Sequence, residues 1–127
     1  MIEITRYIPP DLMARCGFNG NRLARRTLHT YGRKLEVYAG HFMDLRKRRQ
    51  VNLLLVERDR GPSRGINRKR SDFYLGVIFG LHPGEEGCDC REYDRQASKI
   101  ATKRNKVVLK DLEVAVKLKL SEFGHKI

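Results

Sequence analysis

The sequence predicts a single α+β domain spanning residues 1–127, in which a small antiparallel sheet of three to four strands packs with two to three helices and carries a long basic hairpin loop. Two runs in the middle of the chain, VNLLLVE at 51–57 and FYLGVIFG at 73–80, have the apolar, β-branched and aromatic content of buried strands. The segments on either side show helical spacing of apolar residues. A chain of 127 residues with 40% hydrophobic and 33% charged residues is long enough for one core under a heavily charged surface.

The first part of the chain is expected to hold one strand and two helices. Residues 2–8 alternate apolar and polar side chains, which predicts a strand that the following two prolines end. Asp11 is expected to cap a short helix with the sequence LMARC, and Gly17 to end it. A turn-rich connector then leads to a second helix over about residues 21–31.

The predicted second helix carries basic residues on one exposed side. Their spacings of three, one, three and four place them broadly together. A helix, a turn and a second helix occur in this order in helix-turn-helix domains, but the spacing fits that motif poorly. We therefore expect phosphate contacts or a solvated face rather than base reading. The residues on this side are Arg22, Arg25, Arg26, His29 and Arg33.

A charged turn separates two predicted strands in the middle of the chain. KLEVYAGHF at 34–42 predicts a strand, and the RKRR run at 46–49 falls in the turn that follows it. In an antiparallel meander, this turn and the next connection lie at opposite ends of the sheet. The two basic segments would thus share one surface in three cases only. The surface that contacts the partner could run along a face of the sheet, the longer loop could fold back, or the strand order could differ from that of a meander.

The C-terminal third combines an acidic loop with helical segments. Residues 82–92 form the loop, and a helical pattern follows from about Tyr93 to Asn105. Residues 107–123 fit two patterns, because a polar stripe recurs at helical spacing while residues 112–120 also alternate as in a strand. β-branched content favours the strand and continuity with the preceding helix favours the helix; we expect the helix.

The net charge of +12 and a pI near 10.1 predict a polyanionic partner. Residues 46–70 contain ten basic and two acidic residues, so most of the excess charge is concentrated in one window. Nucleic acid is the leading partner, because basic side chains that neutralise phosphates release counterions. An acidic protein surface is the alternative. We expect no membrane partner, since no apolar run approaches the roughly 18 residues of a membrane span.

The segment RDRGPSRGINRKRSD at 58–72 connects the two most apolar runs. A structureless connection of this length is unusual in a compact domain and calls for a functional explanation or disorder. Arginine dominates its charge, and guanidinium groups bind phosphate bidentately and stack on bases. A phosphate-contacting finger is therefore favoured over a solvated hairpin tip or a nuclear import sequence.

The cysteines and the N-terminus indicate an intracellular protein. The three cysteines, Cys16, Cys88 and Cys90, argue for reduced thiols. The N-terminus lacks the pattern of a secretory signal, so we expect a cytoplasmic protein, with the nucleus as the alternative. His82 with Cys88 and Cys90 could supply three metal ligands, which Cys16 or His41 would have to complete; structural zinc normally takes four ligands. No metal and no cofactor are therefore expected.

No catalytic motif is present in the sequence. A metal-independent ribonuclease needs only a base, an acid and cations at the phosphate. The side chains that could furnish these groups, besides the arginines, are His29, His41, His82, Glu36 and Glu57. Any basic protein of this size offers such groups, so no catalytic residue is assigned.

Together these observations predict a small intracellular nucleic-acid-binding protein without catalytic activity. RNA is favoured over DNA, because a finger rich in Arg, Gly and Asn suits irregular shapes and single strands. The candidates for base stacking are Tyr38, Phe73 and Tyr74. One alternative is a phage or viral factor that binds an acidic surface of a host protein, and a second is the ribonuclease. The expected phosphate-contacting residues are Arg22, Arg25, Arg26, Arg33, Arg46, Lys47, Arg48, Arg49, Arg58, Arg60, Arg64, Arg68, Lys69 and Arg70.

Overall fold

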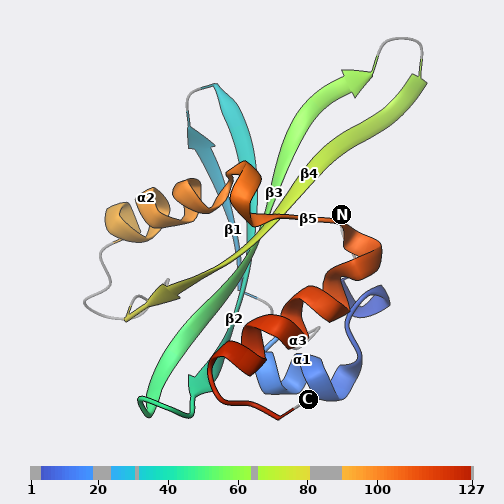
Figure 1. Ribbon diagram of the computed structural model, residues 1–127. Helices are drawn as coiled ribbons and strands as arrows, with labels where there is room; N and C mark the ends of the chain where they lie inside the picture. The colour runs from blue at the N-terminus through green and yellow to red at the C-terminus, as the bar shows by residue number, and fades with distance from the viewer. Residues whose placement is uncertain (1–3, 19–23, 31, 64–65, 81–89, 127) are drawn as a thin grey trace.

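The computed structural model describes residues 4–18, 24–30, 32–63, 66–80 and 90–126. They form one antiparallel sheet with the strand order β1-β2-β3-β4-β5 and helices on both of its faces (Figure 1). The predicted α+β class is confirmed, although the sheet has five strands rather than three to four. The elements in chain order are η1 (Ile4–Arg6), α1 (Pro10–Cys16), β1 (Ala24–Thr30), β2 (Arg33–Asp44), β3 (Arg49–Ser63), β4 (Ile66–Phe79), α2 (Cys90–Ile100), η2 (Lys103–Asn105), β5 (Lys106–Val107), η3 (Leu109–Asp111) and α3 (Leu112–Glu122).

The predicted strand at 2–8 is wrong in its described part, which begins with the short 3-10 helix η1. Ile4 and Ile8 are both buried, and the Ile8 amide donates to the Ile4 carbonyl at 3.1 Å. The same two apolar residues fit a strand period of two and one helical turn, and packing selected the turn. The predicted helix that follows is confirmed as α1, which ends at Gly17 with a φ of 76°. The predicted cap is wrong, because Pro9 is the N-cap and Asp11 lies in the first turn.

The predicted helix at 21–31 is also wrong, because Ala24–Thr30 forms the edge strand β1. β1 pairs with β2 in the register Leu28↔Leu35, and both leucines are buried. The backbone of this polar segment obtains its hydrogen bonds from β2, and that tertiary pairing outweighs a weak helical preference. The basic residues of this segment are consequently divided between the two faces of the sheet.

The three predicted central strands are confirmed, and two of them are much longer than expected. Instead of a loop, residues 59–63 and 66–71 continue the β3–β4 hairpin, through the pairs Asp59↔Ser71, Pro62↔Lys69 and Ser63↔Ile66, with irregular register on both sides of Pro62. We call residues 59–63 and 66–71 the ribbon. Its two strands extend away from the rest of the sheet (Figure 1).

Both faces of the sheet are covered, and each has its own apolar core. On one face, α1 and α3 pack against a cluster that includes Tyr38, Leu53 and Leu55. On the other face, Tyr93, Ala97 and Ile100 of α2 pack against a second cluster that includes Leu54 and Val56. α2 approaches the sheet closely at Gly76, where an added Cβ would lie 2.8 Å from Cγ1 of Ile100.

The C-terminal segment is helical, as expected, after a two-residue strand. β5 pairs with β4 through Phe73↔Val107 and Tyr74↔Lys106, and α3 follows from Leu112 to Glu122. The preceding helix α2 ends at Ile100 rather than near residue 105, where η2 completes the connection.

Candidate nucleic-acid interface

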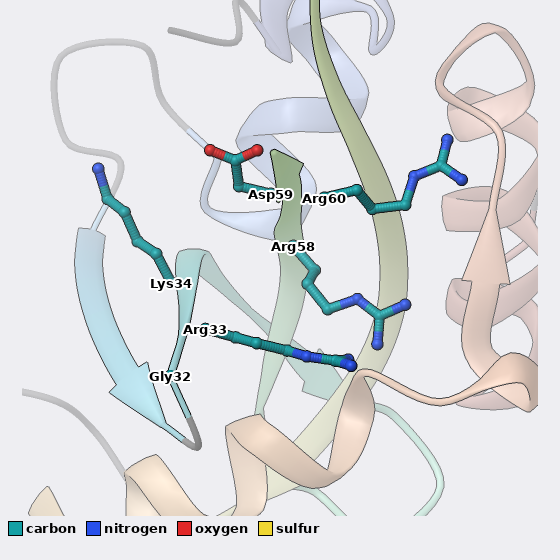
Figure 2. Close-up of a pocket in the computed structure, with 6 residues that line it drawn as sticks. All are labelled: Gly32, Arg33, Lys34, Arg58, Asp59 and Arg60. Carbon is teal, nitrogen blue, oxygen red and sulfur yellow. The ribbon is translucent and has the colours of Figure 1, made fainter. Parts of the chain in front are cut away.

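A basic cleft opens where two hairpins of the sheet separate. The pairing of β2 with β3 ends at Leu35↔Arg58, and beyond it the β1–β2 hairpin and the ribbon diverge (Figure 1). A cavity of about 550 Å³ lies between them, which we call the arm cleft. Its lining contains four basic residues and one carboxylate (Figure 2): Gly32, Arg33, Lys34, Arg58, Asp59 and Arg60.

Strand alternation divides these side chains between the two sides of the sheet. Figure 2 shows Arg33, Arg58 and Arg60 directed to one side and Lys34 and Asp59 to the other. The three arginines lie on the face that α2 covers, because Leu35, Leu54 and Val56 at even spacing from them belong to the α2 core. Three guanidinium groups from two hairpins thus lie on the same face of the sheet (Figure 2).

Asp72 organises the base of the ribbon. Its side chain is only 7% exposed, and it contacts Arg60 Nε at 3.3 Å, Arg58 Nη2 at 3.4 Å and Lys106 Nζ at 3.4 Å. Burial alone would raise the pKa of this carboxyl, but hydrogen bonds from Lys106 and Arg58 and the charges of Arg60 and Lys106 outweigh it and lower the pKa. One carboxylate cannot neutralise three cations, so the base of the ribbon retains positive charge.

Arg58 and Arg33 differ in how they are held. The Arg58 guanidinium lies 5.5 Å from the centre of the Tyr74 ring and pairs with Asp72, so its position is fixed from two sides. Arg33 is exposed and makes no ion pair with the residues that the structure describes. Together they offer one preorganised and one adaptable guanidinium to an anion in the cleft.

Two of the predicted phosphate contacts on β1 are held by carboxylates. Arg26 forms a two-pronged pair with Asp94 of α2, at 2.7 and 2.9 Å. Arg25 pairs at 2.9 Å with Glu36, whose carboxylate also accepts from the Thr27 hydroxyl. These contacts join β1 to α2 and to β2 and reduce the charge that both arginines offer to a ligand.

The basic turn at 46–49 lies at the opposite end of the sheet from the ribbon (Figure 1), as a meander requires. The buried Asp44 accepts from the backbone amides of Arg46 and Lys47, at 3.0 and 3.2 Å, and pairs with Arg49 at 3.3 Å. Arg49 also stacks on Phe79, 4.0 Å from the ring centre. The structure does not bring this turn together with the arm cleft.

The three stacking candidates are parts of the core rather than exposed rings. Tyr38 and Tyr74 are 1% and 3% exposed, and Phe73 is partly buried against the α1–α3 core. The Tyr38 hydroxyl donates to Glu57 at 3.1 Å, and burial together with this carboxylate raises the pKa of Tyr38 to about 12. Since both sheet faces are covered, alternation buries these rings on one side or the other.

Three further predicted contacts lie on the described part of the ribbon. Arg68, Lys69 and Arg70 belong to β4, with Lys69 opposite Pro62. Arg64 and Arg22 lie outside the described residues. The ribbon therefore places three consecutive basic residues on a strand that leads away from the arm cleft.

Some of the residues considered for a metal site or for acid–base chemistry lie in the part of the chain that the structure describes. No group of three metal-ligating side chains occurs there. His82 and Cys88 lie outside that part, and Cys16 is a buried thiol whose pKa burial raises to about 12. Glu36 and Glu57 are engaged by Arg25 and Tyr38, respectively.

Sequence reasoning missed three side chains of this region: Lys34, Lys106 and Asp72. Asp72 could have been found from the hairpin itself, because pairing the apolar runs in register places it opposite Arg58. Lys106 could not, because it reaches Asp72 only through a two-residue strand that has no recognisable pattern.

Comparison with protein-family models, with curated proteins and with solved structures found no match. Among the described helices, none has the length and apolar character required to cross a membrane. The interface is therefore interpreted from its own geometry and charge.

Proposed function

We propose that this chain is a nucleic-acid-binding protein without catalytic activity, and that it holds phosphates in the arm cleft and along the ribbon. The observation that carries the proposal is a cavity of about 550 Å³ whose lining holds four basic residues and a single carboxylate. Arg33, Arg58 and Arg60 lie on one side of the sheet, and Lys34, which pairs with Glu36 at 3.6 Å, lies on the other (Figure 2). The ribbon extends this basic surface by three further basic residues, Arg68, Lys69 and Arg70.

Electrostatics supports a polyanion as the ligand. Arginines that share one carboxylate repel one another, and a phosphate chain would relieve that repulsion while releasing its own counterions. Guanidinium groups suit phosphate better than ammonium groups do, since they form two parallel hydrogen bonds to it. Arg58, which is held by Asp72 and Tyr74, would lose little side-chain freedom on binding.

The proposed footprint covers only the ribbon end of the sheet. The turn at 46–49 lies at the other end, and Arg25 and Arg26 are paired with carboxylates, so these residues are expected to contribute less. The sequence favoured RNA because residues 58–72 were expected to form an irregular loop. Because the segment is a paired ribbon, that reason no longer applies.

Two identical tripeptides provide a matched test of this footprint. Arg-Lys-Arg occurs at 68–70 on the ribbon and at 46–48 in the opposite turn. Changing either tripeptide to Gln-Gln-Gln removes the same charge from the same residue types. Fluorescence anisotropy with a labelled oligonucleotide of mixed sequence, titrated at several salt concentrations, measures both variants.

The ribbon variant is expected to bind at least about tenfold more weakly and to lower the slope of log K against log salt by about two to three, as expected for three lost phosphate contacts. The turn variant is expected to stay within about threefold of the unmodified protein, because screening weakens charges more than a Debye length away. Equal losses would show that binding follows total charge, which would overturn the footprint. Failure of the unmodified protein to bind any nucleic acid would overturn the function and leave an acidic protein surface as the partner.

A further inference from the structure

We infer that the partner is double-stranded DNA, with the ribbon lying in the major groove and the arm cleft on the adjoining phosphate backbone. The inference rests on the proposed function and specifies its ligand. Three properties of the ribbon carry it: its isolation from the rest of the sheet, its length, and its lack of aromatic residues.

The ribbon has the cross-section that a groove accepts. β2 leaves β3 at Arg58 and β5 leaves β4 at Phe73, so in the described chain the two ribbon strands pair only with each other. Strands in such a pair lie about 5 Å apart. The major groove of B-DNA is about 12 Å wide and admits a two-stranded ribbon, whereas that of A-form RNA is too narrow and deep for side chains to read.

The ribbon is also long enough to reach the groove floor. From Arg58 to Ser63, β3 advances five residues, or about 16 Å at about 3.3 Å per residue. The major groove is about 8.5 Å deep. A ribbon that enters the groove to its floor would thus leave Arg58, Arg60 and Arg33 at the level of the flanking phosphates.

Single-stranded nucleic acid fits this surface less well. Proteins that bind single strands stack bases on aromatic side chains, and each such contact contributes about 1–3 kcal/mol. Residues 59–71 contain no aromatic residue. At the base of the ribbon, Tyr74 is buried and Phe73 is partly buried in the core. The surface therefore offers cations and a narrow projecting strand pair, which suit a duplex.

The first test compares polymers of one sequence. Anisotropy at two salt concentrations is measured with a 20-base-pair DNA duplex, the matching RNA duplex, and single strands of both. We expect the DNA duplex to bind at least tenfold more tightly than the other three. Equal or tighter binding of either RNA or of single-stranded DNA would overturn this inference while leaving the proposed function intact; absence of binding to all four would overturn both.

The second test locates the ribbon in a groove by methylation with dimethyl sulfate. This reagent modifies guanine N7, which lies in the major groove, and adenine N3, which lies in the minor groove. We expect protection at guanine N7, and we expect the Gln-Gln-Gln variant at 68–70 to lose it while the matched variant at 46–48 keeps it. Protection confined to adenine N3, or at neither position despite saturating duplex, would overturn the major-groove placement.

Discussion

Asp72 shows how one buried carboxylate arranges a basic surface. Its side chain is 7% exposed, whereas the side chains of Arg58, Arg60 and Lys106 around it are 25%, 49% and 52% exposed. The cations therefore remain accessible to a ligand while their inner contacts are fixed. Asp44 has the corresponding place in the opposite turn, where backbone amides take most of its hydrogen-bonding capacity.

We predict that Asp72→Asn lowers the free energy of unfolding by about 1–3 kcal/mol, since a neutral amide cannot satisfy three neighbouring cations. The lowered pKa of Asp72 means that the folded state binds fewer protons than the unfolded state below pH about 4. The stabilisation from this carboxylate is thus complete above its ordinary pKa of 3.8 and is lost as the pH falls through the folded value. Urea titrations from pH 6 to pH 3 should show a steeper decline for the unmodified protein than for the variant; parallel curves would contradict this role.

Cys16 is predicted to be chemically inert in the folded protein. Its side chain is buried and burial raises its pKa to about 12, so the thiolate that reacts with disulfide reagents is scarce at pH 8. In a variant with Cys88→Ser and Cys90→Ser, Ellman's reagent should titrate no thiol until urea unfolds the chain, and then one. Rapid reaction in native buffer would show that the α1 side of the core opens readily.

Helix α3 provides a test of which residues hold the α1–α3 core. Leu112, Val116 and Leu120 are fully buried, whereas Val114 and Leu118 are 58% and 62% exposed. Leu120→Ala is expected to cost about 2–4 kcal/mol of unfolding free energy, and Leu118→Ala no more than about 0.5 kcal/mol. The two changes are chemically identical and two residues apart, so similar costs in urea denaturation would contradict the observed orientation of the helix.

The same helix explains why the sequence pattern alone did not distinguish a helix from a strand in this segment. In residues 112–120 the apolar side chains recur at every second position, which fits a strand, and half of them are four residues apart, which fits a helix. The structure buries the set at helical spacing, Leu112, Val116 and Leu120. At 24–30, by contrast, a polar segment with helical spacing became a strand, because β2 offered it a partner. Local pattern identified the buried strands at 51–57 and 73–80 correctly, since these need no information from distant residues.

The ribbon was misjudged for a related reason. Gly61, Pro62 and Asn67 are turn-forming residues, and the sequence at 58–72 is too polar to predict a strand by itself. The buried halves of β3 and β4 fix the register, which continues outward through backbone hydrogen bonds. The sequence therefore identified Arg58, Arg60 and Arg33 as candidates. That they line one cleft could not be predicted, because it depends on where the pairing of β2 with β3 ends.

For the molecule as a whole, folding and the proposed binding are expected to be separable. None of the described core residues lies within 59–71. We predict that replacing residues 60–70 with an Asn-Gly turn, which suits a two-residue hairpin, shifts the melting temperature by less than about 5 °C and abolishes nucleic-acid binding. Circular dichroism melts and anisotropy measure the two effects; a large loss of stability would show that the ribbon supports the sheet.

The isolation of the ribbon also exposes it to a hazard, because unpaired strand edges invite a second copy of the chain to add to them. Each ribbon strand presents such an edge in the described structure, and the irregular register around Pro62 together with the missing amide hydrogen of proline interrupts one of them. The Arg and Lys residues at 68–70 lie on the other strand, where like charges oppose edge-to-edge addition. The side chains proposed to attract DNA would in this way also keep the free protein from self-association.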